Sequence, residues 1–111
     1  MENKFVDYSD VNINDGFWQK KQKQNAEVTV YSIYDRFKET GRFDALNLSW
    51  HEGEKNKPHI FWDSDFAKWA ESVSYILNKS PDKKLQALLD EMIDVIEKNQ
   101  EECGYYNIWY K

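Results

Sequence analysis

The stretch SPDKKLQALLDEMIDVIEKNQ, residues 80–100, decides the fold. Its apolar side chains recur every three or four positions, a spacing that predicts an amphipathic helix. The stripe consists of Leu85, Leu88, Leu89, Met92, Ile93 and Ile96. Ser80 is a candidate N-cap, and Pro81 occupies the first helical position, where its fixed φ and missing N–H are tolerated. We expect this helix to end near Glu101, before Gly104.

A second helix is predicted just before the first, over about residues 64–79. Its apolar positions also follow the helical period. They are Phe66, Trp69, Ala70, Val73, Ile76 and Leu77. Asp63 or Ser64 can accept hydrogen bonds from its first free backbone N–H groups.

A third helical pattern begins at Phe17. Its apolar face is formed by Ala26, Val30, Ile33, Tyr34 and Phe37. Gly41 is placed to end this helix as a left-handed C-terminal cap. Residues 42–60 show no sustained period and are long for a structureless connection, and such loops are often functional or mobile. Residues 5–13 are interpreted as a short strand or an extended arm that ends at the turn residues 14–16.

These segments predict a mainly α fold with an N-terminal arm and about three helices. The 111 residues suit one small domain or part of a larger one. We divide the chain into an N-terminal arm or short strand over residues 1–16 and a helical segment over residues 17–111.

Composition restricts the partners. Fifteen Lys and Arg stand against 20 Asp and Glu, for a formal net charge of −5, which argues against nucleic acid or an anionic membrane as the main partner. The run QKKQKQ at residues 19–24 is interpreted as one solvated helix face. No stretch approaches the roughly 20 apolar residues of a membrane span, and residues 1–4 open no signal-peptide core. We therefore expect a cytoplasmic protein.

The cysteine and histidine content predicts neither a disulfide nor a metal site in this chain. Cys103 is the single cysteine, so an internal disulfide is excluded. With only His51 and His59 beside it, the usual zinc-ligand spacings are absent. We expect no cofactor bound by these residues.

Aromatic residues make up 16% of the chain, which suits either a ring-packed core or a carbohydrate-binding surface. In Trp62-Asp63-Ser64-Asp65, with Trp69 further along the helix, two carboxylates could bind sugar hydroxyls beside stacking indoles. In the alternative, Asp63 and Ser64 cap the helix, Asp65 interacts with its dipole, and the rings are core. Asp63 and Asp65 do not supply the geometry of a glycosidase carboxylate pair, because such pairs normally come from different elements.

The stretch Gly104-Tyr105-Tyr106-Asn107 has two interpretations. A flexible residue followed by rings and an amide is typical of a cleft rim. Helix capping followed by a packed aromatic segment explains it equally well.

Several motifs together resemble a known family. They are VNINDGFW at residues 11–18, TGR at residues 40–42, PHIFWDSD at residues 58–65 followed by Lys68-Trp69, and SPD at residues 80–82. Over about residues 11–110 the chain resembles glycoside hydrolase family 127, the β-L-arabinofuranosidase-like enzymes. The resemblance implies the opening part of an (α/α)6 barrel.

The resemblance also implies a retaining hydrolysis of terminal β-L-arabinofuranosides, with a zinc-bound cysteine nucleophile and a glutamate acid/base that lie outside this chain. Cys103 does not match that nucleophile, so no catalytic residue and no metal ligand is assigned here, and zinc is implied only for the complete enzyme. The residues that could support or border a sugar site are Trp62, Asp63, Asp65, Trp69, Tyr105 and Asn107.

Three hypotheses about function follow. In the first, the chain is an N-terminal fragment of such a hydrolase, which acts on arabinofuranosyl-containing carbohydrate when complete and is inactive alone. In the second, it is a small carbohydrate-binding module. In the third, it is a helical module that forms homo-oligomers through exposed helix faces.

Overall fold

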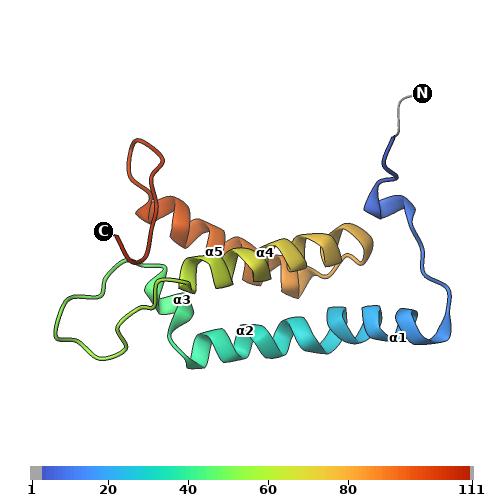
Figure 1. The fold of residues 1–111 in the computed structure, drawn as a ribbon, viewed down its shortest axis with the longest axis horizontal. Coiled ribbons are helices and arrows are strands. Elements are labelled where there is room, and N and C mark those ends of the chain that lie inside the picture. Colours follow the sequence, from blue (N-terminus) through green and yellow to red (C-terminus); the bar gives the residue numbers. More distant parts are fainter. Residues whose placement is uncertain (1–3, 111) are drawn as a thin grey trace.

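A long, nearly continuous helical rod forms one side of the molecule (Figure 1). The computed structural model describes residues 4–110. In the rod, α1 (Gly16–Gln24) leads directly into the π-helical segment η2 (Asn25–Thr29) and then into α2 (Val30–Glu39). The helix predicted from Phe17 onward is therefore confirmed, with a π-helical segment that the period of its apolar residues did not reveal.

A left-handed glycine ends this rod. Gly41 has φ 81° and directly follows α2 and its C-cap residue, a position where glycine avoids the steric penalty of a side chain. The short helix α3 (Arg42–Ala45) comes next, within the predicted loop 42–60. Four residues are too few to show a helical period, so the sequence did not predict α3. Phe43 in α3 and Leu46 after it are buried.

The two remaining long helices, α4 (Trp62–Lys79) and α5 (Lys83–Asn99), form a hairpin that lies along the rod (Figure 1). Both begin with caps other than those predicted. The N-cap position of α4 is Phe61, whose side chain makes no capping bond. Asp82, not Ser80, caps α5, because its carboxylate accepts bonds of 3.0 and 3.1 Å from two backbone N–H groups of the first turn.

Buried apolar side chains from both sides of the molecule meet in one core. Its members are Val30, Tyr34, Phe43, Ala45, Leu46, Phe66, Trp69, Val73, Ile76, Leu85, Leu89, Met92 and Ile108. Most come from the predicted stripes. Ile33 and Ile93, which we also expected in the stripes, are 38% and 46% exposed. Ile33 lines a shallow depression beside Lys68 and Ser72 of α4 and is only partly covered.

The N-terminal arm contains the 3-10 helix η1 (Tyr8–Asp10) and no strand within its described part. The Lys79 ammonium hydrogen-bonds to the Val11 carbonyl and lies 4.8 Å from the centroid of the Tyr8 ring, so the arm is held beside the end of α4. Of the two predicted segments, residues 1–3 and 111 lie outside the described residues. The boundary between the segments, at residues 16 and 17, stays a prediction.

Length and apolar character decide whether any helix of residues 4–110 could cross a membrane. None combines the length and the apolar character that a membrane crossing requires.

Candidate functional site

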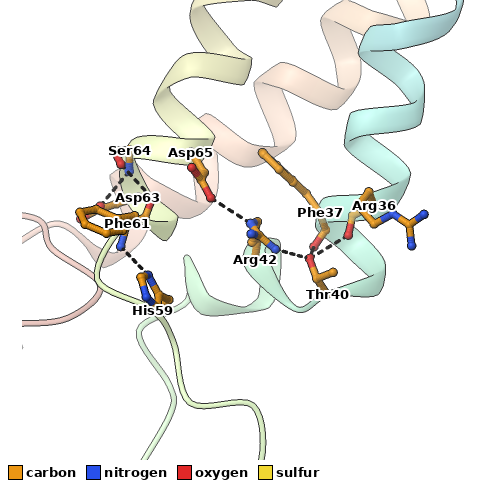
Figure 2. Close-up of polar contacts among 9 residues, drawn as sticks. All are labelled: Arg36, Phe37, Thr40, Arg42, His59, Phe61, Asp63, Ser64 and Asp65. Carbon is orange, nitrogen blue, oxygen red and sulfur yellow. Dashed lines mark hydrogen bonds and ion pairs between the residues drawn. The ribbon is translucent and has the colours of Figure 1, made fainter.

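Arg42 links the helical rod to the start of α4 (Figure 2). Its Nε donates to Asp65 Oδ2 at 3.1 Å, and its Nη1 donates to Thr40 Oγ1 at 2.8 Å. The Thr40 hydroxyl in turn donates to the Arg36 carbonyl at 2.8 Å. The side chains of Arg42 and Asp65 are only 25% and 30% exposed, so solvent screens this ion pair less than a fully exposed one.

The same guanidinium contacts two aromatic rings. Arg42 Cζ lies 5.2 Å from the ring centroid of Phe37 and 5.2 Å from that of Trp62, a distance typical of cation–π contacts. Trp62 is therefore half-buried against Arg42. Arg42 was expected only as part of the TGR motif, because its pairing with Asp65 on a later helix leaves no local signal in the sequence.

Asp63 and Asn107, two of the predicted site residues, lie in contact. Asn107 Nδ2 donates to Asp63 Oδ2 at 3.3 Å. Asn107 Oδ1 accepts bonds from the backbone N–H groups of Trp109 and Tyr110, at 2.9 and 2.7 Å. Tyr105, also predicted, is 47% exposed and donates to the Tyr110 carbonyl at 3.3 Å. The amide of Asn107 thus connects the C-terminal segment to the first turn of α4.

Neither Asp63 nor Ser64 occupies the N-cap position, since α4 begins before both residues, but Asp63 accepts a backbone N–H of the first turn as predicted. Ser64 Oγ donates to the Phe61 carbonyl at 2.8 Å, and Asp63 Oδ1 accepts the Ser64 N–H at 2.8 Å (Figure 2). The Phe61 N–H donates to His59 Nδ1 at 3.3 Å. Asp63 and Asp65 both lie in the first turn, where the helix dipole stabilises negative charge. This position agrees with the interpretation in which Asp65 interacts with the helix dipole.

Trp69 lies in the core and not in the site. Its side chain is 3% exposed, and its Nε1 donates to the Val30 carbonyl at 3.0 Å. The centroids of Tyr34, Phe43 and Phe66 lie 5.7, 5.8 and 6.1 Å from that of Trp69. The interpretation of this ring as core holds, and burial removes Trp69 from the side chains that a sugar can reach.

Tyr106 ties the C-terminal segment to the end of α3. Its hydroxyl donates to the Leu46 carbonyl at 2.8 Å. Burial raises the pKa of Tyr106 above its usual value, and the nearby Asp63 carboxylate raises it further. The phenol therefore stays protonated and acts as a donor. Tyr106 was not among the predicted site residues.

The described residues offer a hydrogen-bonded polar cluster, formed by Arg42, Asp63, Asp65 and Asn107, and no metal site. Within residues 4–110, no three His, Cys, Asp or Glu side chains are grouped so that they could hold a metal ion. Asp63 is bound by Asn107 and Asp65 by Arg42. This arrangement can orient the start of α4 and present hydrogen-bonding groups at its edge.

Comparison with known proteins identifies the family of this chain. The family described as "Beta-L-arabinofuranosidase, GH127 catalytic domain" matches residues 10–111. The chain belongs to this family. A solved GH127 β-arabinofuranosidase superposes with a TM-score of 0.81 at 30% sequence identity, over 91% of this chain and 16% of that chain. The predicted family and the mainly helical fold of this part of an α/α barrel are thereby confirmed.

A curated relative supports the same family. The non-reducing end β-L-arabinofuranosidase of Bifidobacterium longum subsp. longum is 40% identical over 52 residues, which are 47% of this chain and 8% of the relative. The GH127 chain described here thus spans a small part of the length of both relatives.

Proposed function

We propose that residues 10–111 form one part of the catalytic domain of a retaining glycoside hydrolase that acts on arabinofuranosyl-containing carbohydrate. The observation that carries the proposal is the GH127 match over nearly the whole chain, together with a TM-score of 0.81 to a solved β-arabinofuranosidase. We further propose that this chain does not hydrolyse such substrates by itself.

In this proposal the polar cluster at the start of α4 supports the edge of a sugar site. Arg42 holds Trp62 and Asp65 in place, and Asn107 holds Asp63. Carboxylate and amide oxygens can accept hydrogen bonds from sugar hydroxyls, and an exposed ring such as Tyr105 can stack on the apolar face of a sugar. Rigid support of this kind keeps such groups in a productive geometry.

The catalytic groups of the family would come from other residues than those described here. A bound zinc ion would favour the thiolate form of a coordinating cysteine, but no group of side chains in residues 4–110 fits a metal ion. Asp63 and Asp65 lie in one helical turn and each already has a partner. They do not provide the two carboxylates on opposite sides of a scissile bond that glycoside hydrolysis commonly uses.

An activity measurement tests this proposal. The purified chain is incubated with an aryl β-L-arabinofuranoside, and release of the aryl alcohol is followed beside a complete GH127 β-L-arabinofuranosidase as positive control. We expect no release above buffer from the chain alone. Hydrolysis that persists through purification and disappears on heat denaturation would contradict the proposal.

Self-association is a second candidate function, which exposed apolar side chains favour. Phe17 and Trp18 on α1 are 61% and 60% exposed, and Ile93 on α5 is 46% exposed. Apolar surface of this kind drives association between chains. Sedimentation velocity over a hundredfold range of concentration tests it. A concentration-dependent rise in mass that Ile93→Glu weakens would support it, and a constant monomer mass would exclude it.

A further inference from the structure

A lysine side chain contacts two indole rings, one from the loop before α4 and one from the C-terminal segment. Lys57 Nζ lies 5.5 Å from the ring centroid of Trp50 and 5.0 Å from that of Trp109, both within the range of cation–π attraction. Trp50 and Lys57 belong to the loop between α3 and α4, and Trp109 follows α5. We name Trp50, Lys57 and Trp109 the tryptophan–lysine cluster.

The loop holds its half of the cluster through hydrogen bonds of its own. Trp50 Nε1 donates to the Glu54 carbonyl at 3.3 Å, and the His51 N–H donates to Glu54 Oε2 at 2.9 Å. Two left-handed residues bend the loop between them: Gly53 has φ 97° and Asn56 has φ 59°. Asparagine is one of the few residues other than glycine that adopts the left-handed region readily, so Asn56 suits this bend. Asn56 directly precedes Lys57 and sets the direction from which the lysine leaves the loop.

The C-terminal segment holds the other indole. The Trp109 N–H is bound by Asn107 Oδ1 at 2.9 Å, and the neighbouring Ile108 is 8% exposed. Trp109 itself remains 40% exposed. Its backbone is therefore anchored while part of its ring stays accessible beside Lys57, so little conformational entropy is lost when a ligand contacts it.

The charge of Lys57 is available to a ligand. None of the ion pairs within residues 4–110 involves Lys57. The loop carries two acidic side chains, Glu52 and Glu54. Glu54 accepts the His51 N–H, and its Oε2 lies 4.0 Å from His51 Nδ1. The cluster thus combines two aromatic faces with a cation that has no carboxylate partner in the described chain.

A ligand that satisfies both features must carry an apolar ring face and a carboxylate. A small inorganic anion would pair with Lys57 and leave the indoles unused, and a neutral sugar would stack and leave the ammonium unpaired. A uronic acid unit has a pyranose ring with an apolar C–H face and a carboxylate on the same ring. We propose that the tryptophan–lysine cluster binds uronic acid units of an acidic oligosaccharide, independently of any hydrolytic activity.

The five tryptophans of the chain allow a site-resolved test by NMR of their indole N–H signals. Trigalacturonic acid is titrated into the 15N-labelled chain, and neutral arabinotriose is titrated in parallel. We expect the acid to shift the Trp50 and Trp109 signals while the Trp18 signal, from an exposed indole on α1, stays unchanged. Binding should weaken as salt rises, since the ammonium–carboxylate attraction is screened.

Two variants separate the parts of the proposal. Lys57→Gln should weaken trigalacturonate binding about threefold, the scale of an exposed ion pair, whereas Lys38→Gln, an exposed lysine on α2, should not. Trp109→Ala should weaken it about fivefold, the scale of an aromatic contact, with an unchanged circular dichroism spectrum. Equal binding of arabinotriose, an equal shift at Trp18, or unaltered binding by Lys57→Gln would each overturn the proposal.

Discussion

Replacing Trp69 by phenylalanine distinguishes a core tryptophan from a sugar-binding one. Trp69 is 3% exposed and donates its indole N–H to the Val30 carbonyl at 3.0 Å. Phenylalanine cannot donate this bond, whose net contribution is about 1 kcal/mol. The smaller ring also leaves a void among the neighbouring aromatics, and cavities of this kind add about 1 kcal/mol more. We therefore expect Trp69→Phe to lower the free energy of unfolding by about 2 kcal/mol.

Trp69→Ala should cause the largest loss of stability among these variants. Loss of a whole buried aromatic side chain costs about 3–5 kcal/mol, which is a large share of the stability of a domain of this size. Trp18 provides the matched control, because it is 60% exposed and its change to phenylalanine should alter stability by less than about 0.5 kcal/mol.

Urea denaturation followed by far-ultraviolet circular dichroism measures these differences. The account predicts a lower midpoint for Trp69→Phe with an unchanged denaturant slope, which marks a change in stability and not in compactness. If Trp69→Phe were as stable as the wild type, while Trp18→Phe lost stability, the assignment of Trp69 to the core would be refuted.

Three further changes test other contacts. Gly41→Ala should destabilise the chain by about 1 kcal/mol, because φ of 81° is unfavourable for alanine; an unchanged melting temperature would contradict this. Tyr31→Phe removes the hydroxyl bond that is the main cause of the lowered pKa of Asp82. The stability that this bond contributes is present above the pKa of Asp82 in the unfolded chain and is lost as the pH falls through its pKa in the folded chain. The variant should therefore lose less stability on acidification than the wild type, and an equal loss of stability in both would argue against the bond. Burial, followed by this bond, raises the pKa of Tyr31 to about 12, so the stabilisation from the protonated phenol should fade as the pH rises from the usual tyrosine pKa toward that value. Because the pKa of Tyr106 is raised as well, the phenol absorbance of the wild type is compared with that of Tyr31→Phe, and equal late ionisation in the two would count against this effect. Asn107→Ala should lower stability by about 1–2 kcal/mol and speed proteolysis of the C-terminal segment, since it removes the bonds to Asp63 and two backbone N–H groups; equal cleavage rates would exclude this role.

The long helices could be predicted from the sequence because each has an uninterrupted apolar period. Helix starts were harder to place. Asp82 and Ser80 are both good caps by type, and only the backbone conformation at Asp82 decides between them. The stripes also included Ile33 and Ile93, which are exposed, because a period identifies an apolar face without identifying what covers it.

The candidate site could be predicted only in part. The motif around Trp62 and Asp63 marked the correct end of α4, and the resemblance named the correct family. The contacts that organise this end join residues far apart in the chain, as Arg42 with Asp65 and Asn107 with Asp63 do. Such pairs depend on how the helices pack, and no local pattern records them. Trp69 shows the opposite error, since it belongs to the motif that predicted a sugar site but lies buried in the core.

The most direct test of the account is a transplant into a complete enzyme. Residues 10–111 replace the matching part of the solved GH127 β-arabinofuranosidase, and hydrolysis of an aryl β-L-arabinofuranoside is measured beside the parent enzyme. The account predicts that the chimera folds and hydrolyses the substrate, while the 111-residue chain alone does not. A chimera that melts cooperatively near the parent temperature yet shows no hydrolysis would contradict the claim that this chain is a working part of a GH127 catalytic domain.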